Sequence, residues 1–140
     1  MNSTDIRSVS ILTVAGIFSA TYVGLVILLD VAGHTFALVQ DLAVNALFFS
    51  GAVPAILTAQ YWIRREQAAP GNRRAWTYAI FCGAVSTALL GGLAAAGLLG
   101  DSRHPQWSWL RLTSVLVCNT LWANIGFSTV FSYYQPRTRK

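Results

Sequence analysis

The sequence predicts an all-α membrane protein, with a single domain over residues 1–140 made of four transmembrane helices. Two observations predict this fold class. Hydrophobic residues make up 54% of the chain and charged residues only 11%, whereas a soluble domain carries about 25% charged residues. The hydrophobic residues also fall into four runs, each close to the roughly 20 residues that a helix needs to cross a bilayer.

The four runs are separated by short polar stretches and contain no charged side chain in their interiors. A backbone inside lipid must satisfy its hydrogen bonds within a helix or a closed barrel, and these runs lack the alternation of barrel strands. Each run is therefore predicted to be a helix. The predicted helices cover about residues 11–29, 42–63, 76–99 and 112–131.

The distribution of lysine and arginine predicts the orientation of these helices. Of the ten basic residues, eight lie in the N-terminal segment, in the loop between the second and third helices, and in the C-terminal tail. Short segments rich in Lys and Arg stay on the cytoplasmic side of a membrane. Both termini and the central loop are therefore predicted to be cytoplasmic, in a multi-pass protein of a bacterial-type inner membrane. Trp62 and Trp76 are expected at the same membrane surface.

The two halves of the chain, about residues 8–65 and 74–135, show signs of an internal repeat. Asn45 of the second predicted helix matches Asn119 of the fourth. If the repeat is real, the halves are parallel and related by an axis along the membrane normal. Small residues are common where membrane helices meet, so coincidence is the alternative. The small-residue matches, all at one offset, are Gly16/Gly83, Ser19/Ser86, Gly24/Gly91 and Gly33/Gly100.

The central polar stretch holds the first group of candidate site residues, which are Arg64, Arg65, Arg73 and Arg74. They are expected at the depth of the lipid headgroups, where a planar guanidinium binds phosphate through two hydrogen bonds. The same arginines also determine the orientation and attract any anionic lipid, by about 1 kcal/mol per charge. The sequence is compatible with specific headgroup binding and with this general attraction alone.

Polar side chains inside the predicted helices form the second group. Asn45, Asn119 and Asn124, together with Gln60, are candidates for a polar seam between the halves, because polar residues in lipid are costly and often functional. Alternatively, they only form hydrogen bonds between helices, worth roughly 0.6 kcal/mol each. Pro54 is expected to kink the second helix, since it removes a backbone hydrogen bond and crowds the preceding turn.

This architecture resembles the GtrA-like family of small four-helix membrane proteins. The resemblance covers about residues 14–134 and includes two parallel helix pairs, each closed by aromatic and basic residues. These endings read Tyr61-Trp62-Ile63-Arg64-Arg65 and Tyr133-Tyr134-Gln135-Pro136-Arg137. The family is associated with polyprenyl-phosphate-linked sugars, which its members are proposed to move across the membrane, or to assist the glycosyltransferase that makes them. The resemblance thus implies binding or translocation of such a lipid-linked substrate, with membrane lipid or a glycosyltransferase as partner.

The sequence favours other function classes less. Its basic residues lie between apolar runs and not in a nucleic-acid-binding patch, and it contains no catalytic set, metal-ligand cluster or cofactor motif. We therefore expect no enzyme activity, no nucleic-acid partner, no metal and no cofactor. The alternative function is a non-catalytic accessory subunit, or an immunity-type interaction protein, of a larger membrane complex. A homo-oligomer is also open.

Overall fold

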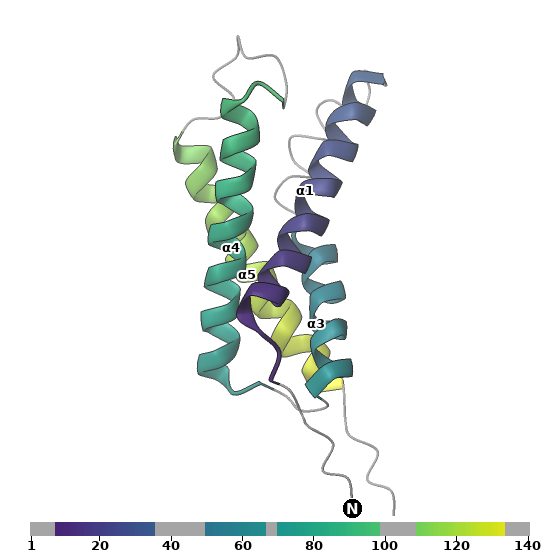
Figure 1. Cartoon of the computed structure of the whole chain (residues 1–140), viewed down its shortest axis with the longest axis vertical. Coiled ribbons are helices and arrows are strands. Elements are labelled where there is room, and N and C mark those ends of the chain that lie inside the picture. Colours follow the sequence, from purple (N-terminus) through teal and green to yellow (C-terminus); the bar gives the residue numbers. More distant parts are fainter. Residues whose placement is uncertain (1–7, 36–49, 67–69, 99–108, 134–140) are drawn as a thin grey trace, which may run out of the picture.

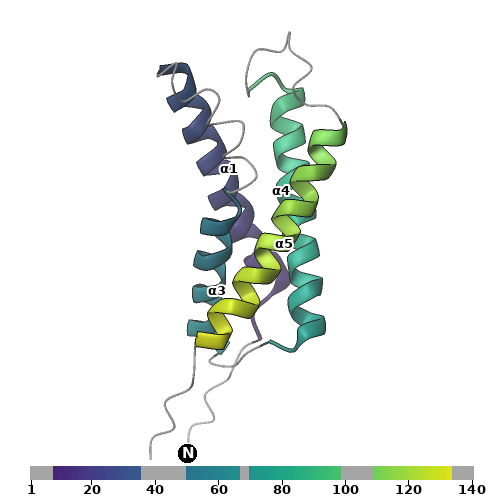
Figure 2. The ribbon, with the colours of Figure 1, turned by 180° about the vertical axis from the view of Figure 1, so that it is seen from behind.

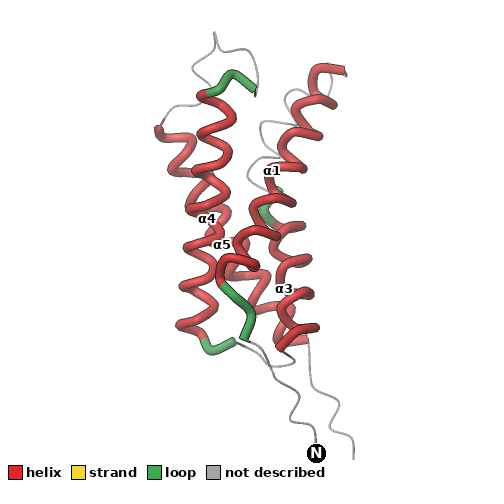
Figure 3. Tube along the Cα trace, viewed as in Figure 1, coloured by secondary structure: helices red, strands yellow, loops and turns green. Residues whose placement is uncertain are grey.

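The computed structural model describes residues 8–35, 50–66, 70–98 and 109–133. Within these ranges the chain forms helices and short loops and no strand (Figure 3). The helices are α1 (Ile11–Thr35), α3 (Ala52–Glu66), α4 (Asn72–Ala95) and α5 (Trp109–Tyr133). The prediction of an all-helical fold is therefore confirmed for the described part of the chain.

The helices form an elongated bundle in which α5 runs obliquely. α5 packs on both α4 and α3, and α1 lies against α4 and α3. The first half of α5 lies beside α4 and its second half beside α3 (Figure 1, and from behind in Figure 2). The start of α1, the end of α3, the start of α4 and the end of α5 meet at one end of the bundle. We call this the basic end, because it carries Arg64, Arg65, Arg73 and Arg74.

Local sequence signals determine where the helices begin and end. The Ser10 hydroxyl oxygen accepts a hydrogen bond from the Leu12 N–H at 3.3 Å, as expected of a serine that caps a helix start. After α4, Gly97 adopts a positive φ of 72°, and the Leu98 N–H donates to the Leu93 carbonyl at 3.0 Å. This is the arrangement with which glycine commonly ends a helix. α4 begins and ends one turn earlier than predicted.

The helix predicted over residues 42–63 is not continuous. Ser50 and Gly51 form a turn, and α3 starts after them at Ala52; the preceding part of the prediction lies outside the described residues. Pro54 is therefore the third residue of a helix. The first N–H groups of a helix have no carbonyl partner within it, so a proline there removes no hydrogen bond. Pro54 thus lies in the first turn of α3, and because the chain before Ser50 lies outside the described residues, the expected kink stays a prediction.

Two interior glycines let α5 approach its neighbours closely. Gly83 of α4 faces Leu116 and Thr120 of α5, and a Cβ at Gly83 would lie 3.1 Å from the Leu116 carbonyl oxygen. Gly126 of α5 faces Ala55 of α3, where an added Cβ would lie 2.6 Å from the Ala55 Cβ. Small residues at a helix crossing allow the backbones to come together and gain dispersion contacts. The two glycines therefore position α5 between α4 and α3.

The outer surface of the bundle is apolar. Each of the four helices exposes large hydrophobic side chains, for example Leu12, Ile56, Ile80 and Val117. α1 and α4 are long and apolar enough to cross a membrane, yet only about a third of the apolar stretch of α1 is buried, and less of that of α4. The core helix of a soluble protein would be mostly buried, so the exposure of these two helices favours a membrane setting.

The other two described helices, α3 and α5, are not both long and apolar enough to cross a membrane. α3 has 15 residues, and a span needs about 20. α5 has 25 residues, but it contains Arg111, Asn119 and Asn124, which make it less apolar. The described residues therefore contain four helices, of which two are long and apolar enough to span a membrane.

Candidate functional site at the basic end

The basic end is organised by Glu66, the last residue of α3. One carboxylate oxygen lies 2.7 Å from Nη2 of Arg74, and the other lies 2.8 Å from Nη1. The backbone N–H of Val9 donates to the same carboxylate. The Glu66 side chain is only 7% exposed. This is a bidentate ion pair whose carboxylate is largely removed from water.

Arg74 connects three parts of the bundle. Its Nη2 also donates to the Val9 carbonyl oxygen and to the Tyr78 hydroxyl, each at 3.2 Å, and that hydroxyl donates to the Val9 carbonyl at 2.9 Å. The guanidinium carbon lies 5.1 Å from the centre of the Trp62 ring and 5.2 Å from that of Tyr78, within cation–π range. Through these hydrogen bonds and the ion pair, Arg74 links the segment before α1 to the end of α3 and the start of α4.

The four arginines predicted to bind a headgroup fall into two groups, one arginine that is paired with Glu66 and three that are exposed. Arg74 is engaged with Glu66, so it can bind a phosphate in bidentate fashion only after that ion pair breaks. Arg64, Arg65 and Arg73 are exposed, and the structure shows no ion pair for them among the residues it describes. Headgroup binding by the four arginines therefore stays a prediction, and at Arg74 it requires that the ion pair with Glu66 be broken first.

Two features of the basic end were not predicted from the sequence. Glu66 is the only acidic residue in the stretch 64–74, and this isolation among arginines is the signal that could have marked it as an ion-pair partner. Trp62 is expected at the membrane surface, but its ring is fully buried. It stacks on Tyr78 with 4.6 Å between ring centres and meets Phe127 edge-on at 5.3 Å. Trp62 is therefore a core residue.

The surroundings of Glu66 lower its pKa. Burial alone would raise the pKa of this carboxyl, but the hydrogen bonds from Arg74 and from the Val9 N–H, with the positive charge of Arg74, bring it below the ordinary value. A carboxyl whose pKa is lower in the folded state stabilises the fold fully above its unfolded pKa. That stabilisation is lost as the pH falls through the folded pKa.

We therefore expect the melting temperature to decrease once the pH falls below about 4.5, the ordinary pKa of glutamate. Glu66→Gln lacks the charge at every pH, so this variant should melt lower than the wild type at neutral pH. The difference should shrink as the pH decreases through the folded pKa of Glu66. Tryptophan fluorescence during heating in detergent measures both proteins. A difference that does not change with pH would contradict this role of the carboxylate.

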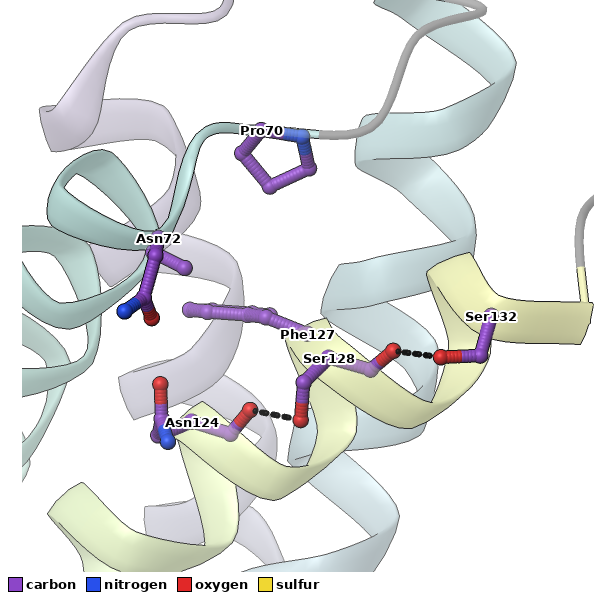
Figure 4. Close-up of a pocket in the computed structure, with 7 residues that line it drawn as sticks. Pro70, Asn72, Asn124, Phe127, Ser128 and Ser132 are labelled. Atoms are coloured by element: carbon purple, nitrogen blue, oxygen red, sulfur yellow. Dashed lines mark hydrogen bonds between the residues drawn. The ribbon is translucent and has the colours of Figure 1, made fainter.

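A pocket of about 320 Å³ opens beside this cluster, between the start of α4 and the end of α5 (Figure 4). Figure 4 shows the Phe127 ring between the side chains of Asn72 and Asn124. The pocket combines prolyl, aromatic, carboxamide and hydroxyl groups, and none of its lining residues is charged. The lining residues are Pro70, Asn72, Ala75, Asn124, Phe127, Ser128 and Ser132.

The polar groups of the pocket suit a ligand rich in hydroxyl groups. The Ser128 hydroxyl donates to the Asn124 carbonyl at 2.9 Å, and that of Ser132 donates to the Ser128 carbonyl at 2.8 Å, so both oxygens keep acceptor capacity. Within the described part of the chain, the carboxamides of Asn72 and Asn124 make no hydrogen bond. Each offers two donors and an acceptor, as a ligand with several hydroxyl groups requires.

The residues predicted to form a polar seam lie in different surroundings. Asn124 lines the pocket, whereas Asn119 is fully buried and its Nδ2 donates to Ser86 Oγ at 3.1 Å. Gln60 is exposed on α3. Asn45 lies outside the described residues. For Asn119 the structure therefore shows the hydrogen bond between helices that was the alternative to a seam.

The chain matches no protein-family model, no curated protein and no solved structure. The resemblance to the GtrA-like family and the internal repeat therefore stay predictions from the sequence. The pocket, together with the exposed arginines at the same end of the bundle, is the best-supported candidate site.

Proposed function

We propose that the protein is a multi-pass membrane protein of a bacterial-type inner membrane that binds and translocates a polyprenyl-phosphate-linked sugar or a similar lipid-linked substrate. In this proposal the chain crosses the membrane four times, with its basic end and both termini in the cytoplasm. The apolar outer surface of the bundle then faces lipid, and the helices satisfy their own backbone hydrogen bonds there.

The observation that supports this function best is the presence of two carboxamides that make no hydrogen bond to the described residues, next in sequence or space to an exposed arginine. Asn72 and Asn124 line the pocket, and Arg73 follows Asn72 in the first turn of α4. Sugar hydroxyl groups donate and accept hydrogen bonds, and a carboxamide can do both with each of them. Arginine binds phosphate oxygens through paired hydrogen bonds. A sugar in the pocket and a phosphate at Arg73 thus meet groups of matching chemistry.

The protein also has surfaces that are complementary to the polyprenyl chain and to the negative charge of such a substrate. Near the pocket, α4 exposes Trp76 and Ile80, and α5 exposes Ile125, which is an apolar surface suited to a polyprenyl chain. Arg64 and Arg65 add positive charge at the basic end and attract an anionic headgroup from the membrane. The arginine paired with Glu66 has a structural role in this account.

Transfer of a labelled headgroup across vesicle membranes tests this proposal. The reconstituted protein should accelerate exposure of a fluorescent polyprenyl-phosphate sugar to a quencher that does not cross the bilayer. Asn124→Leu should slow this protein-dependent rate about 2- to 10-fold, as expected for lost hydrogen bonds between neutral groups. Arg73→Ala should slow it roughly 10-fold or more, because its hydrogen bonds are to a charged group.

Gln60→Leu is the matched control, because it removes an exposed carboxamide from α3 that does not line the pocket. This variant should keep the wild-type rate. Equal rates for Asn124→Leu and Gln60→Leu would exclude the pocket as the binding site. If the wild-type protein fails to accelerate exposure, translocation is excluded. A stoichiometric partner that copurifies in mild detergent would then favour the accessory-subunit function.

A further inference from the structure

We propose that the interior of the bundle holds a buried water molecule at Asn119, next to the turn that precedes α3. This site is separate from the pocket at the basic end and does not depend on the proposed function. It is formed by side chains of α1, α4 and α5 together with the backbone at the start of α3.

The first observation is an unpaired oxygen. Asn119 is fully buried, and its Nδ2 donates to Ser86 Oγ at 3.1 Å, while that hydroxyl donates to the Gly83 carbonyl at 3.1 Å. The Asn119 Oδ1 is also buried and has no hydrogen-bond partner. Buried carbonyl oxygens in native proteins are nearly always bonded to protein or to ordered water.

The second observation is the set of groups around this oxygen. The Tyr22 hydroxyl of α1 lies within reach of both Asn119 and Ser50. Gly51 lies beside Asn119, since a Cβ added there would be 2.7 Å from Asn119 Oδ1. Ser19, three residues before Tyr22 and so on the same face of α1, has a buried hydroxyl oxygen that also lacks a partner. Buried polar groups of α1 and α5 and the turn before α3 thus lie close to one another.

The start of α3 determines the chemistry of the ligand. Ala55 donates its N–H to the carbonyl of the turn glycine at 3.1 Å. The N–H groups of Ala52 and Val53 have no carbonyl partner within the helix, and Pro54 has no N–H. A ligand between these groups and Asn119 Oδ1 must accept and donate hydrogen bonds. The positive helix start disfavours a cation, and the unpaired carbonyl oxygen disfavours an anion, so neutral water fits both.

Nuclear magnetic resonance in lipid nanodiscs tests this site directly. With 15N-labelled asparagine side chains, magnetisation transfer from water to the Asn119 carboxamide should give a cross-peak, although this side chain is fully buried. The signal is assigned by its loss in Asn119→Leu. The Asn124 carboxamide in the open pocket is the positive control for exchange with solvent. Absence of a water cross-peak at Asn119 in the folded wild-type protein would overturn the proposal.

Thermal unfolding of Asn119→Leu provides a second readout. If water is bound, leucine leaves the water and the start of α3 without their acceptor, and the melting temperature should fall by several degrees. If the site is dry, the gain from removing an unpaired buried carbonyl offsets the lost hydrogen bond to Ser86, and the melting temperature should change little or rise. A rise would count against the water molecule even in a variant that folds normally. Asn124→Leu, at the exposed pocket, controls for general effects of the substitution.

Discussion

Replacing Arg74 with alanine is expected to lower the free energy of unfolding by about 2–3 kcal/mol. The change leaves the Glu66 carboxylate, which is 7% exposed, without its bidentate partner. Removing one partner of a fully buried ion pair costs about 3–5 kcal/mol. The Arg74 side chain is 35% exposed, so water screens part of the interaction and the expected loss is smaller. The variant also loses the cation–π contact with Trp62.

Arg73→Ala is the matched control for this prediction. Arg73 precedes Arg74 in α4 and carries the same charge, but it is exposed, so its loss should change stability by less than about 0.5 kcal/mol. Thermal and denaturant unfolding in one detergent compares the two variants. A double-mutant cycle with Glu66→Ala then isolates the coupling between the two charges. Equal losses for both arginines would show that general positive charge, and not the ion pair, stabilises the basic end.

Gly126→Ala is expected to destabilise the bundle by about 1–3 kcal/mol, as overpacking of a close contact does. The added Cβ would lie 2.6 Å from the Ala55 Cβ and 3.1 Å from the Ala55 carbonyl oxygen. Because backbone atoms cannot rotate away, α3 and α5 must move apart to accept the methyl group. The same unfolding measurements determine the size of this effect.

Gly24→Ala is the control for Gly126→Ala and should change the free energy of unfolding in the opposite direction. Gly24 lies within α1, and an added Cβ there would meet nothing within 4 Å. Alanine is favoured over glycine inside a helix by about 0.5–1 kcal/mol, so this variant should be slightly more stable than the wild type. If both variants lost stability equally, the close crossing of α5 and α3 would not be the cause.

The helical fold could be predicted because an apolar run of about 20 residues can satisfy its backbone hydrogen bonds in lipid in few ways other than as a helix. The helix boundaries could not be predicted as well, because hydropathy reports where the chain is apolar and not where a helix stops. α1 continues through Asp30 to Thr35, although the apolar run ends at that aspartate. From the sequence, Pro54 is compatible with a kink or with a helix start, and only the turn at Ser50 and Gly51 shows that it lies in the first turn of α3.

The candidate site could be predicted in part. Asn124 stands out as a polar residue in an apolar run, and it lines the pocket. Asn72 was not predicted because it belongs to the polar stretch between two predicted helices, where an asparagine is ordinary. Only the oblique course of α5 brings Asn124 close to it. The role of Arg74 also depends on three-dimensional structure, since any of the arginines in this stretch could have paired with Glu66.

Native mass spectrometry of the protein released from vesicles tests most directly whether the pocket at the basic end binds a lipid-linked sugar. The vesicles contain a polyprenyl-phosphate sugar and an excess of phosphatidylglycerol. The wild-type protein should retain one molecule of the sugar lipid in preference to phosphatidylglycerol. The double variant Asn72→Ala, Asn124→Leu should lose this preference, whereas Gln60→Leu keeps it. Equal retention of both lipids by the wild type, or an unchanged preference in the double variant, would contradict binding of the sugar lipid in this pocket.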